Sequence, residues 1–179
     1  AAHLVSVACS TRQRKPLIEE AQFEQIGNVK SPATDGWFVL YVSEAPWFRS
    51  DRFGAGGRFE GQTRFPQIGV HLRVLEPGVP ACLYHRENAQ EDFFVIEGEC
   101  LLIVENEERR LHAGHFVHCP AETDHVFVGA GEAPCVILMI GYRPDEEVLC
   151  YPVNELAAEY GASVDKETAN QAEAYGEML

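Results

Sequence analysis

GVPACLYHRENAQEDFFVIEGE, which runs from Gly78 to Glu99, is the stretch that decides the fold. It holds His85 and Glu87 two residues apart on an expected short strand. Side chains two apart on a strand point to the same face, so we expect both to enter one side of a sheet. Residues 88–90 then predict a reversal, and the apolar run FFVI predicts a new strand that begins beside Glu91.

A second stretch, GHFVHCPAETDHVF from Gly114 to Phe127, adds His125 on a further short strand. Two imidazoles and two carboxylates then converge from separate strands, namely His85, Glu87, Glu91 and His125. Nitrogen and oxygen ligands suit borderline and hard divalent metals. The sequence therefore predicts a cation site made of these four residues.

At these residues the chain resembles the cupin superfamily, as a small single-domain member of the bacterial type. The first cupin motif has a glycine, then H-x-H, then a glutamate three or four residues on and a glycine after six more. That frame is filled by Gly78, His85, Glu87, Glu91 and Gly98. Glu87 replaces the second histidine of the motif, and Gly78 stands one residue further upstream than usual.

The second motif has a glycine, a proline and a histidine, and Gly114, Pro120 and His125 match it. Glu122 stands where a glycine is common, and His115 stands where an aspartate often follows the first glycine. The two motifs cover residues 78–127, and flanking strands extend the likeness to about 65–143.

The resemblance implies an all-β fold, the double-stranded β-helix or jelly-roll barrel. It also implies a divalent ion held by His85, Glu91 and His125, with an open coordination position for water or substrate. Glu87 would be a fourth metal ligand or the catalytic base.

Glu87 changes the chemistry of the predicted site. Two carboxylates neutralise a divalent ion formally, which weakens its Lewis acidity and favours manganese or iron(II) over copper; zinc and nickel also stay open. In a first alternative, Glu87 turns to solvent or to an arginine and leaves a three-residue site. In a second, the pocket holds no metal, and the facing carboxylates, one with a raised pKa, do acid/base work alone. In a third alternative, the four residues only support the fold and have no role in binding or catalysis.

Alternating apolar residues predict the strands of the barrel. Ile68, Val70, Leu72 and Val74 alternate with polar or small residues, and apolar runs follow at 93–96, 101–104, 109–111, 116–119, 125–128 and 135–140. Seven or eight short strands at this spacing are typical of an antiparallel jelly roll. We expect one domain in three parts: an extension packed on the barrel at 1–64, the barrel at 65–150 and an acidic tail at 151–179.

The extension and the tail give weaker signals. Residues 16–29 predict a weakly helical stretch, and GWFVLYV predicts a strand at 37–42. The aromatic, glycine-rich segment 47–61 predicts a loop or wide hairpin, which in one alternative covers the pocket. In the tail we expect a short helix at Asn154–Tyr160, stopped by Gly161, within a solvated or loosely docked segment.

His71 and Arg73 share a strand face that is either solvent or the mouth of the barrel. At the mouth they would bind a charged substrate, so we name both as candidate substrate-binding residues. His112, His115 and His118 recur at every third position across a strand–turn boundary. We expect them on alternating sides, in ordinary hydrogen bonds.

Composition limits the class of protein. The 179 residues carry a formal charge of −14, which opposes binding to nucleic acid and to anionic membranes. No apolar run approaches the roughly 20 residues that cross a bilayer, and the N-terminal basic cluster follows its apolar patch, the reverse of a secretory signal. The 6 cysteines form no C-x-x-C pair and predict buried, reduced thiols in a cytoplasmic protein, with Cys119 open as a soft ligand.

Two functions stay open, because a fold alone does not decide an activity. The first is a metal-dependent cupin that acts on, or binds, a small organic acid or sugar-like molecule. The second is a non-catalytic module that binds or senses a small molecule without metal. The large apolar residues ahead of Phe65 predict a symmetric homodimer with the strand Trp37–Val42 at its interface. The alternative is a monomer in which this segment folds back on its own barrel.

Overall fold

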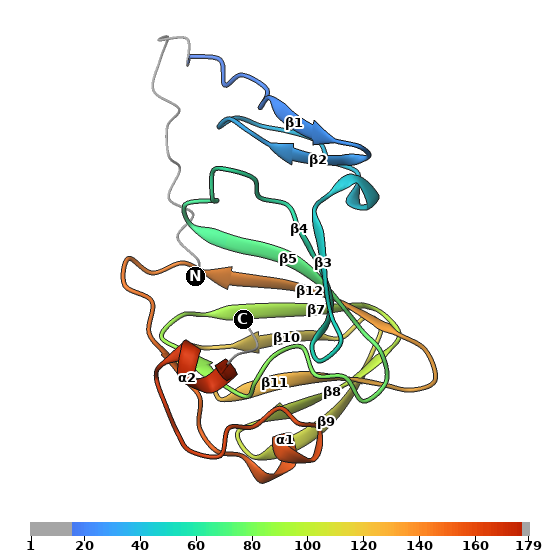
Figure 1. Cartoon of the computed structure of the whole chain (residues 1–179), viewed down its shortest axis with the longest axis vertical. Coiled ribbons are helices and arrows are strands. Elements are labelled where there is room, and N and C mark those ends of the chain that lie inside the picture. Colours follow the sequence, from blue (N-terminus) through green and yellow to red (C-terminus); the bar gives the residue numbers. More distant parts are fainter. Residues whose placement is uncertain (1–15, 177–179) are drawn as a thin grey trace, which may run out of the picture.

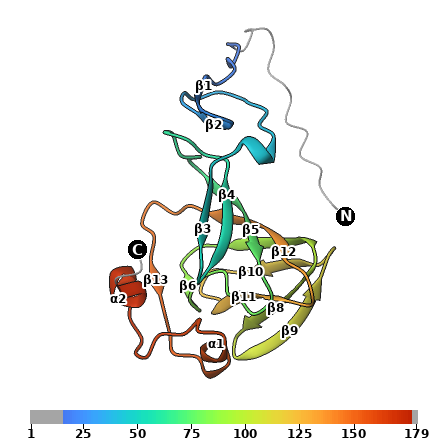
Figure 2. The same cartoon turned by 45° about the vertical axis from the view of Figure 1, so that its right-hand side comes forward.

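The computed structural model of the protein describes residues 16–176. The expectations for the N-terminal patch and for Cys9 lie outside these residues. The described chain is a β-barrel with two short C-terminal helices and an N-terminal hairpin that stands above the barrel (Figures 1 and 2). The expected all-β jelly-roll class is confirmed. Within residues 16–176, no helix is long and apolar enough to cross a membrane.

A six-stranded antiparallel sheet forms one wall of the barrel. In spatial order its strands are β10 (Phe116–Cys119), β7 (Glu91–Glu97), β12 (Cys135–Tyr142), β5 (Ile68–Leu75), β4 (Gly54–Arg58) and β3 (Trp47–Ser50). β5 pairs with β12 over its whole length, from Leu75 opposite Cys135 to Ile68 opposite Tyr142. The alternation of β5 turns His71 and Arg73 toward the barrel interior, where both line a cavity.

A three-stranded sheet forms the opposite wall. Its strands are β11 (His125–Ala130), β8 (Glu99–Val104) and β9 (Glu107–His112). Glu105 and Asn106 join β8 to β9 with φ of +48° and +64°. Two successive positive φ values are typical of the hairpin turn whose twist matches that of the paired strands. At the start of β8, Gly98 has a φ of +73°, and a Cβ there would stand 2.6 Å from the carbonyl oxygen of Pro134.

The hydrophobic core lies between the two walls. It joins buried residues of the large sheet to those of the small one, including Leu75, Val95, Ile137, Cys100, Leu102 and Phe127. A second cluster, around Ile103 and Val126, packs the small sheet against Ala157 and Ala162 of the C-terminal segment. β8 and β11 of the small sheet are thus covered on both faces, and every residue of β11 is buried, whereas β9 is mostly exposed.

The N-terminal extension contains a hairpin where a weakly helical stretch was expected. β1 (Phe23–Ile26) pairs with β2 (Val29–Pro32) as a separate two-stranded sheet. The helical expectation was wrong because Gly27, with a φ of +60°, closes a two-residue turn between the strands.

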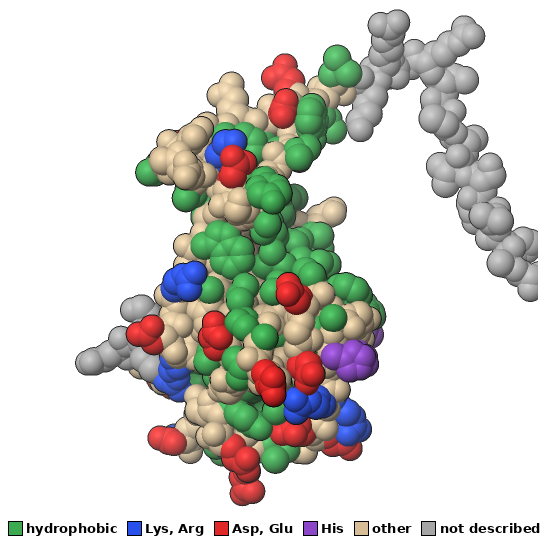
Figure 3. All heavy atoms as spheres, turned by 90° about the vertical axis from the view of Figure 1, so that its right-hand side faces the viewer, with side chains coloured by type: hydrophobic (Ala, Val, Ile, Leu, Met, Phe, Trp, Pro, Cys, Tyr) green, Lys and Arg blue, Asp and Glu red, His purple; other side chains and the backbone are tan. Residues whose placement is uncertain are grey.

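The strand expected at 37–42 was also wrong. Trp37 forms one isolated bridge with Glu20, and the short 3-10 helix η1 (Val42–Glu44) follows. A β-prone sequence becomes a strand only beside a partner, and Val39 and Tyr41 instead stay exposed. Hydrophobic side chains form a band across the waist of the molecule, below the N-terminal hairpin (Figure 3).

Segment 47–61 was expected to form a loop or a wide hairpin. The structure has the hairpin, which is made of β3 and β4. β4 pairs with β5, so the hairpin adds two strands to the edge of the large sheet. Phe48 and Arg58 of this hairpin reach a hollow of the barrel.

The C-terminal segment is docked, although its acidic composition predicted a solvated or loosely docked tail. β13 (Leu149–Cys150) pairs with β6 (Arg86–Glu87), and the helices α1 (Glu155–Glu159) and α2 (Gln171–Tyr175) follow. Asn154 caps α1 as expected and accepts a hydrogen bond from the Ala157 N–H at 2.8 Å. Tyr151 and Ala162 are buried. A few apolar residues thus fix the segment to the barrel despite its charge.

Candidate metal centre and adjoining cavity

The site begins where two antiparallel segments meet. His85 precedes β6 and His125 opens β11, and each donates its backbone N–H to the carbonyl of the other, at 3.2 and 2.8 Å. Opposed residues of an antiparallel pair share a face, and the two imidazole centroids are 5.0 Å apart. Arg86 turns outward to Asp124 at 3.0 Å. The alternation then returns Glu87 to the face of His85.

The two carboxylates lie against the two imidazoles. Glu91 opens β7 opposite Gly141 of β12. Glu91 Oε2 is 3.3 Å from His125 Nε2, and Glu87 Oε1 is 3.6 Å from His85 Nε2. The four residues expected to converge therefore do lie together.

Each imidazole is oriented through its other nitrogen. His85 Nδ1 lies 2.8 Å from the carbonyl oxygen of Leu83, and His125 Nδ1 lies 3.0 Å from that of Thr123. Because a carbonyl oxygen only accepts, Nδ1 must carry a proton and donate it. In the neutral rings Nε2 is then the ligand atom, an arrangement typical of metal-binding histidines.

The electrostatics of the cluster favour a bound cation. Burial and the charge of Glu87 raise the pKa of Glu91 to about 7. Burial alone would lower the pKa of His85, but Cys82, Glu87 and Glu91 outweigh it and hold that pKa well above its usual range. Without a cation, the cluster therefore keeps protons near neutral pH to limit repulsion between its carboxylates. A divalent ion would supply the same compensation.

The other two groups carry no extra proton at neutral pH. Burial and the neighbouring charge of His85 lower the pKa of His125 to about 4. Burial would raise the pKa of Glu87, but its hydrogen bond and charge interaction with His85 bring that pKa below the usual value. Glu87 is therefore ionised and able either to bind a cation or to accept a proton.

Three of these residues form a donor set for a metal. Nitrogens of His85 and His125 and a carboxylate oxygen of Glu91 all lie within 4.8 Å of one another. Two imidazole nitrogens and a carboxylate fit first-row divalent ions such as manganese, iron, zinc or nickel. Glu87 stands beside this set, in contact with His85.

Cys119 does not belong to the donor set. It is buried, and burial raises the pKa of its thiol to about 12, so it stays protonated. The described cysteines, Cys82, Cys100, Cys119, Cys135 and Cys150, are all free.

A cavity of about 200 Å³ adjoins the donor set inside the barrel. Phe93 lines it, with its ring centroid 5.2 Å from that of His125. The C-terminal segment supplies Tyr151, 6.0 Å from His85 between ring centroids, and Tyr175, which packs edge-on against Tyr151. Tyr175 also accepts a hydrogen bond from the Leu83 N–H at 3.3 Å. Aromatic walls around a few polar groups are typical of a small-molecule site.

Sequence reasoning missed Tyr151 and Tyr175. The acidic composition of the segment suggested solvation, and the one contrary signal was the presence of large aromatic groups, which favour burial. Phe48 and Arg58 were missed as individual residues, although a cover formed by their segment was one alternative.

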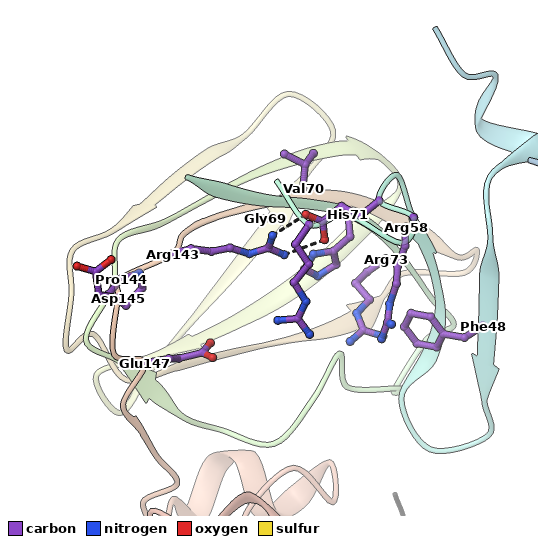
Figure 4. Close-up of a pocket in the computed structure, with 13 residues that line it drawn as sticks. Phe48, Arg58, Gly69, Val70, His71, Arg73, Arg143, Pro144, Asp145 and Glu147 are labelled. Carbon is purple, nitrogen blue, oxygen red and sulfur yellow. Dashed lines mark hydrogen bonds and ion pairs between the residues drawn. The ribbon is translucent and has the colours of Figure 1, made fainter. Parts of the chain in front are cut away.

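His71 and Arg73 lie at the mouth rather than on the outer surface. Both line the metal cavity and also a larger neighbouring hollow of about 660 Å³ (Figure 4). Burial and the charge of Arg73 lower the pKa of His71 to about 4, so this imidazole is neutral. Their location is compatible with contact to a substrate that spans both spaces.

Glu122 occupies the motif position where a glycine is common, and its backbone explains that preference. Its φ is +70°, in the left-handed region that favours glycine. Its N–H donates to the carbonyl of Glu87 at 2.7 Å. This turn therefore fixes the backbone of the candidate base.

The other histidines lie outside the site. His118 pairs with Asp92 at 2.7 Å on the surface. His112 and His115 contact each other with ring centroids 4.1 Å apart. They do not lie on alternating sides as expected, because a turn between them brings the His115 N–H to the carbonyl of His112 at 3.1 Å.

Comparisons with known proteins agree with this architecture. A family model described as a cupin domain matches residues 71–141. An uncharacterised protein of Methanocaldococcus jannaschii is 28% identical over 89 residues, which are 45% of this chain and 71% of that protein.

Two solved structures are similar to parts of this chain. A sugar phosphate isomerase of the cupin superfamily from Silicibacter pomeroyi is 27% identical, with a TM-score of 0.54 over 62% of this chain and 79% of that one. A protein of Acidithiobacillus ferrooxidans, provisionally named a sugar phosphate isomerase, is 32% identical with a TM-score of 0.45. That match covers 46% of this chain and 55% of the other, so the chain spans about half of that protein's length.

Proposed function

This chain belongs to the cupin superfamily, and from that premise we propose that it binds one divalent metal ion and acts on a small organic acid or sugar-like molecule. His85, Glu91 and His125 are the proposed ligands. Glu87 is the proposed fourth ligand or catalytic base, and His71 and Arg73 are the proposed substrate contacts.

The observation that carries the proposal is the orientation of the two imidazoles. Their Nδ1 atoms are engaged by the carbonyls of Leu83 and Thr123, and their Nε2 atoms face two partly buried carboxylates. A purely structural pair of histidines does not require two carboxylates around it. A cation satisfies all four groups at once.

The ion would polarise an oxygen of the bound molecule. With one or two carboxylates among its ligands, the site favours manganese or iron(II) over copper. The ionised Glu87 would accept a proton beside that oxygen.

The sugar-like class is supported by the relative from Silicibacter pomeroyi, which is named a sugar phosphate isomerase. An isomerase that moves a carbonyl along a sugar needs a base and an electrophile side by side. Glu87 and the proposed metal would supply them.

Metal stoichiometry tests the proposal. Elemental analysis of protein purified without added metal, followed by titration with manganese, should give one ion per chain. His85→Ala and His125→Ala should each abolish binding, since each removes one of the three donor atoms that lie together. His118→Ala is the matched control, because this exposed histidine contacts Asp92 and not the site.

The competing function is a metal-free binding module. It predicts no metal in the purified protein and no manganese binding in the titration. Stoichiometric metal that persists in the His85/His125 double variant would contradict the proposed site while leaving metal dependence itself intact.

We further propose that two copies pair through the outer face of the large sheet. One cross-strand row spans all six strands on that face: Trp47, Gly57, Leu72, Leu138, Phe94 and Phe116. Trp47, Phe94 and Phe116 are 40%, 41% and 64% exposed. An apolar sheet face of this kind packs well against a second copy of itself.

Light scattering tests the pairing. A dimer gives twice the chain mass of 19.9 kDa, about 40 kDa. Phe116→Ser should shift the equilibrium toward monomer, whereas Val153→Ser, at an exposed position of the C-terminal segment, should not. A wild-type mass near 20 kDa at micromolar concentration would refute the pairing.

A further inference from the structure

The larger hollow beside the metal cavity has a cationic end. It shares His71 and Arg73 with that cavity. Figure 4 shows Arg58 and Arg73 gathered near Phe48 at one end, with Asp145 and Glu147 at the other. The chain as a whole carries a charge of −14, so a local concentration of arginines runs against its composition. Such a feature attracts an anion.

Arg143 also reaches this hollow but is paired with a carboxylate. It binds both carboxylate oxygens of Glu60, at 2.5 and 2.8 Å, and the carbonyl of Phe65 at 2.7 Å. Burial alone would raise the pKa of Glu60, but Arg143 and the Phe65 N–H hold it below its usual value. This ion pair has no net charge, and its role is structural: it ties the segment before β5 to the end of β12.

Arg73 is not compensated in this way. Its Nε and Nη1 atoms are buried, and they make no hydrogen bond to any of residues 16–176. Burial lowers the pKa of Arg73, yet a guanidinium stays charged at neutral pH. A buried cation with unsatisfied donors destabilises a fold. A contribution to stability therefore does not account for Arg73.

Phe48 holds the guanidinium groups in place. Gly56 lies between Phe48 and Arg73 in the strand register, and a Cβ at Gly56 would meet the Phe48 ring at 2.3 Å. The ring therefore covers Gly56. The guanidinium carbons of Arg73 and Arg58 lie 4.8 and 5.2 Å from its centroid. Contact with the ring fixes the two cations beside the hollow. The exposed Arg58 can donate to a ligand there directly, whereas the shielded Nε and Nη1 of Arg73 reach a ligand only when the Arg73 side chain shifts.

We propose that Arg73 and Arg58, positioned by Phe48, bind the phosphate of a phosphate monoester substrate whose remainder reaches the metal cavity. The link to the metal cavity rests on the function proposed above. Two guanidinium groups match the double charge of a phosphate monoester, and guanidinium N–H groups are strong donors to phosphate oxygens. Arg73 lines both spaces, so a phosphate held there leaves the rest of the molecule at the boundary with the donor set.

Calorimetric titration of the full chain with inorganic phosphate and with glycerol phosphate tests the subsite. We expect saturable binding of both, and much weaker binding of acetate. Arg73→Gln and Arg58→Gln should each weaken phosphate binding roughly 10- to 100-fold, the usual loss for a charge-assisted hydrogen bond. Arg58 is exposed, so its variant leaves the core unchanged.

Arg49→Gln is the matched control. Arg49 follows Phe48 on β3 but lines a different hollow, so the same loss of charge should change affinity less than twofold. Phe48→Leu should weaken phosphate binding while both arginines remain. Unchanged affinity in Arg73→Gln, an equal loss in Arg49→Gln, or acetate binding as tight as phosphate would overturn the inference.

The same titration on the His85→Ala/His125→Ala double variant separates the two proposals. Phosphate should still bind to that variant, because its proposed contacts lie outside the metal ligands. If the wild-type protein fails to bind metal but still binds phosphate, the metal function alone is refuted. Failure of phosphate binding in metal-loaded wild type would refute the subsite alone.

Discussion

Metal affinity should fall steeply as the pH drops below 7, because protons and the metal compete for Glu91. Burial and the charge of Glu87 raise the pKa of this carboxyl to about 7, and the metal binds only its ionised form. The proton therefore weakens apparent affinity by a factor of 1 + 10^(7 − pH). That factor is roughly 2 at pH 7, 10 at pH 6 and 100 at pH 5. His85, whose pKa is also raised, should steepen the decline.

Competition between the protein and a manganese-binding dye from pH 5 to 8.5 measures this dependence. Glu91→Gln has no carboxyl proton to lose. Its affinity for manganese should therefore be lower at every pH, and its affinity should depend on pH with a slope smaller by about one proton. His118→Ala should keep the wild-type profile, since His118 lies outside the site. An affinity that stays flat from pH 5 to 8 in the wild type would refute the reasoning for both groups.

Three further variants test individual contacts. Glu87→Ala should weaken metal binding less than Glu91→Ala, which removes a member of the donor set, and titration of both with manganese measures the difference. Asn154→Ala should lower the free energy of unfolding, measured by chemical denaturation, by about 1–2 kcal/mol, because this buried residue caps α1 and also donates to Asn106. Asn170→Ala removes the exposed cap of α2 and should lower the free energy of unfolding less in the same assay. Glu60→Gln should lower stability by about 1–2 kcal/mol at pH 7. Because the pKa of Glu60 is depressed, that stabilisation is present above the ordinary carboxyl pKa of 4.5 and is lost below it, so the gap between wild type and variant should close in acid.

The barrel strands could be predicted because each carries a local pattern. The alternation at 68–74 and the apolar runs that follow became β5 and β7 to β12 with small shifts at their ends. Spacing along one short strand also put Glu87 on the face of His85. The convergence of His85 with His125 was anticipated from the resemblance to the cupin motifs, because it depends on the pairing of two separate segments.

The extension could not be predicted in the same way. GWFVLYV has strong strand propensity but finds no partner strand, and residues 16–29 form a hairpin because of a turn at Gly27. In both cases the outcome depends on pairing with another segment, which a local pattern does not specify.

The remaining walls of the site depend on contacts between residues distant in sequence. Tyr175 reaches Leu83 from the far end of the chain, and Phe48 meets Arg73 only because β4 places Gly56 between them. Composition gave the opposite expectation for the tail, because average charge does not reveal the few apolar residues that dock it.

The most direct test of the central claim is an anomalous difference map from crystals grown with manganese. The account predicts one peak per chain, about 2.0–2.3 Å from the Nε2 atoms of His85 and His125 and from a carboxylate oxygen of Glu91. A peak at any other place, or no peak in protein that elemental analysis shows to contain manganese, would contradict it.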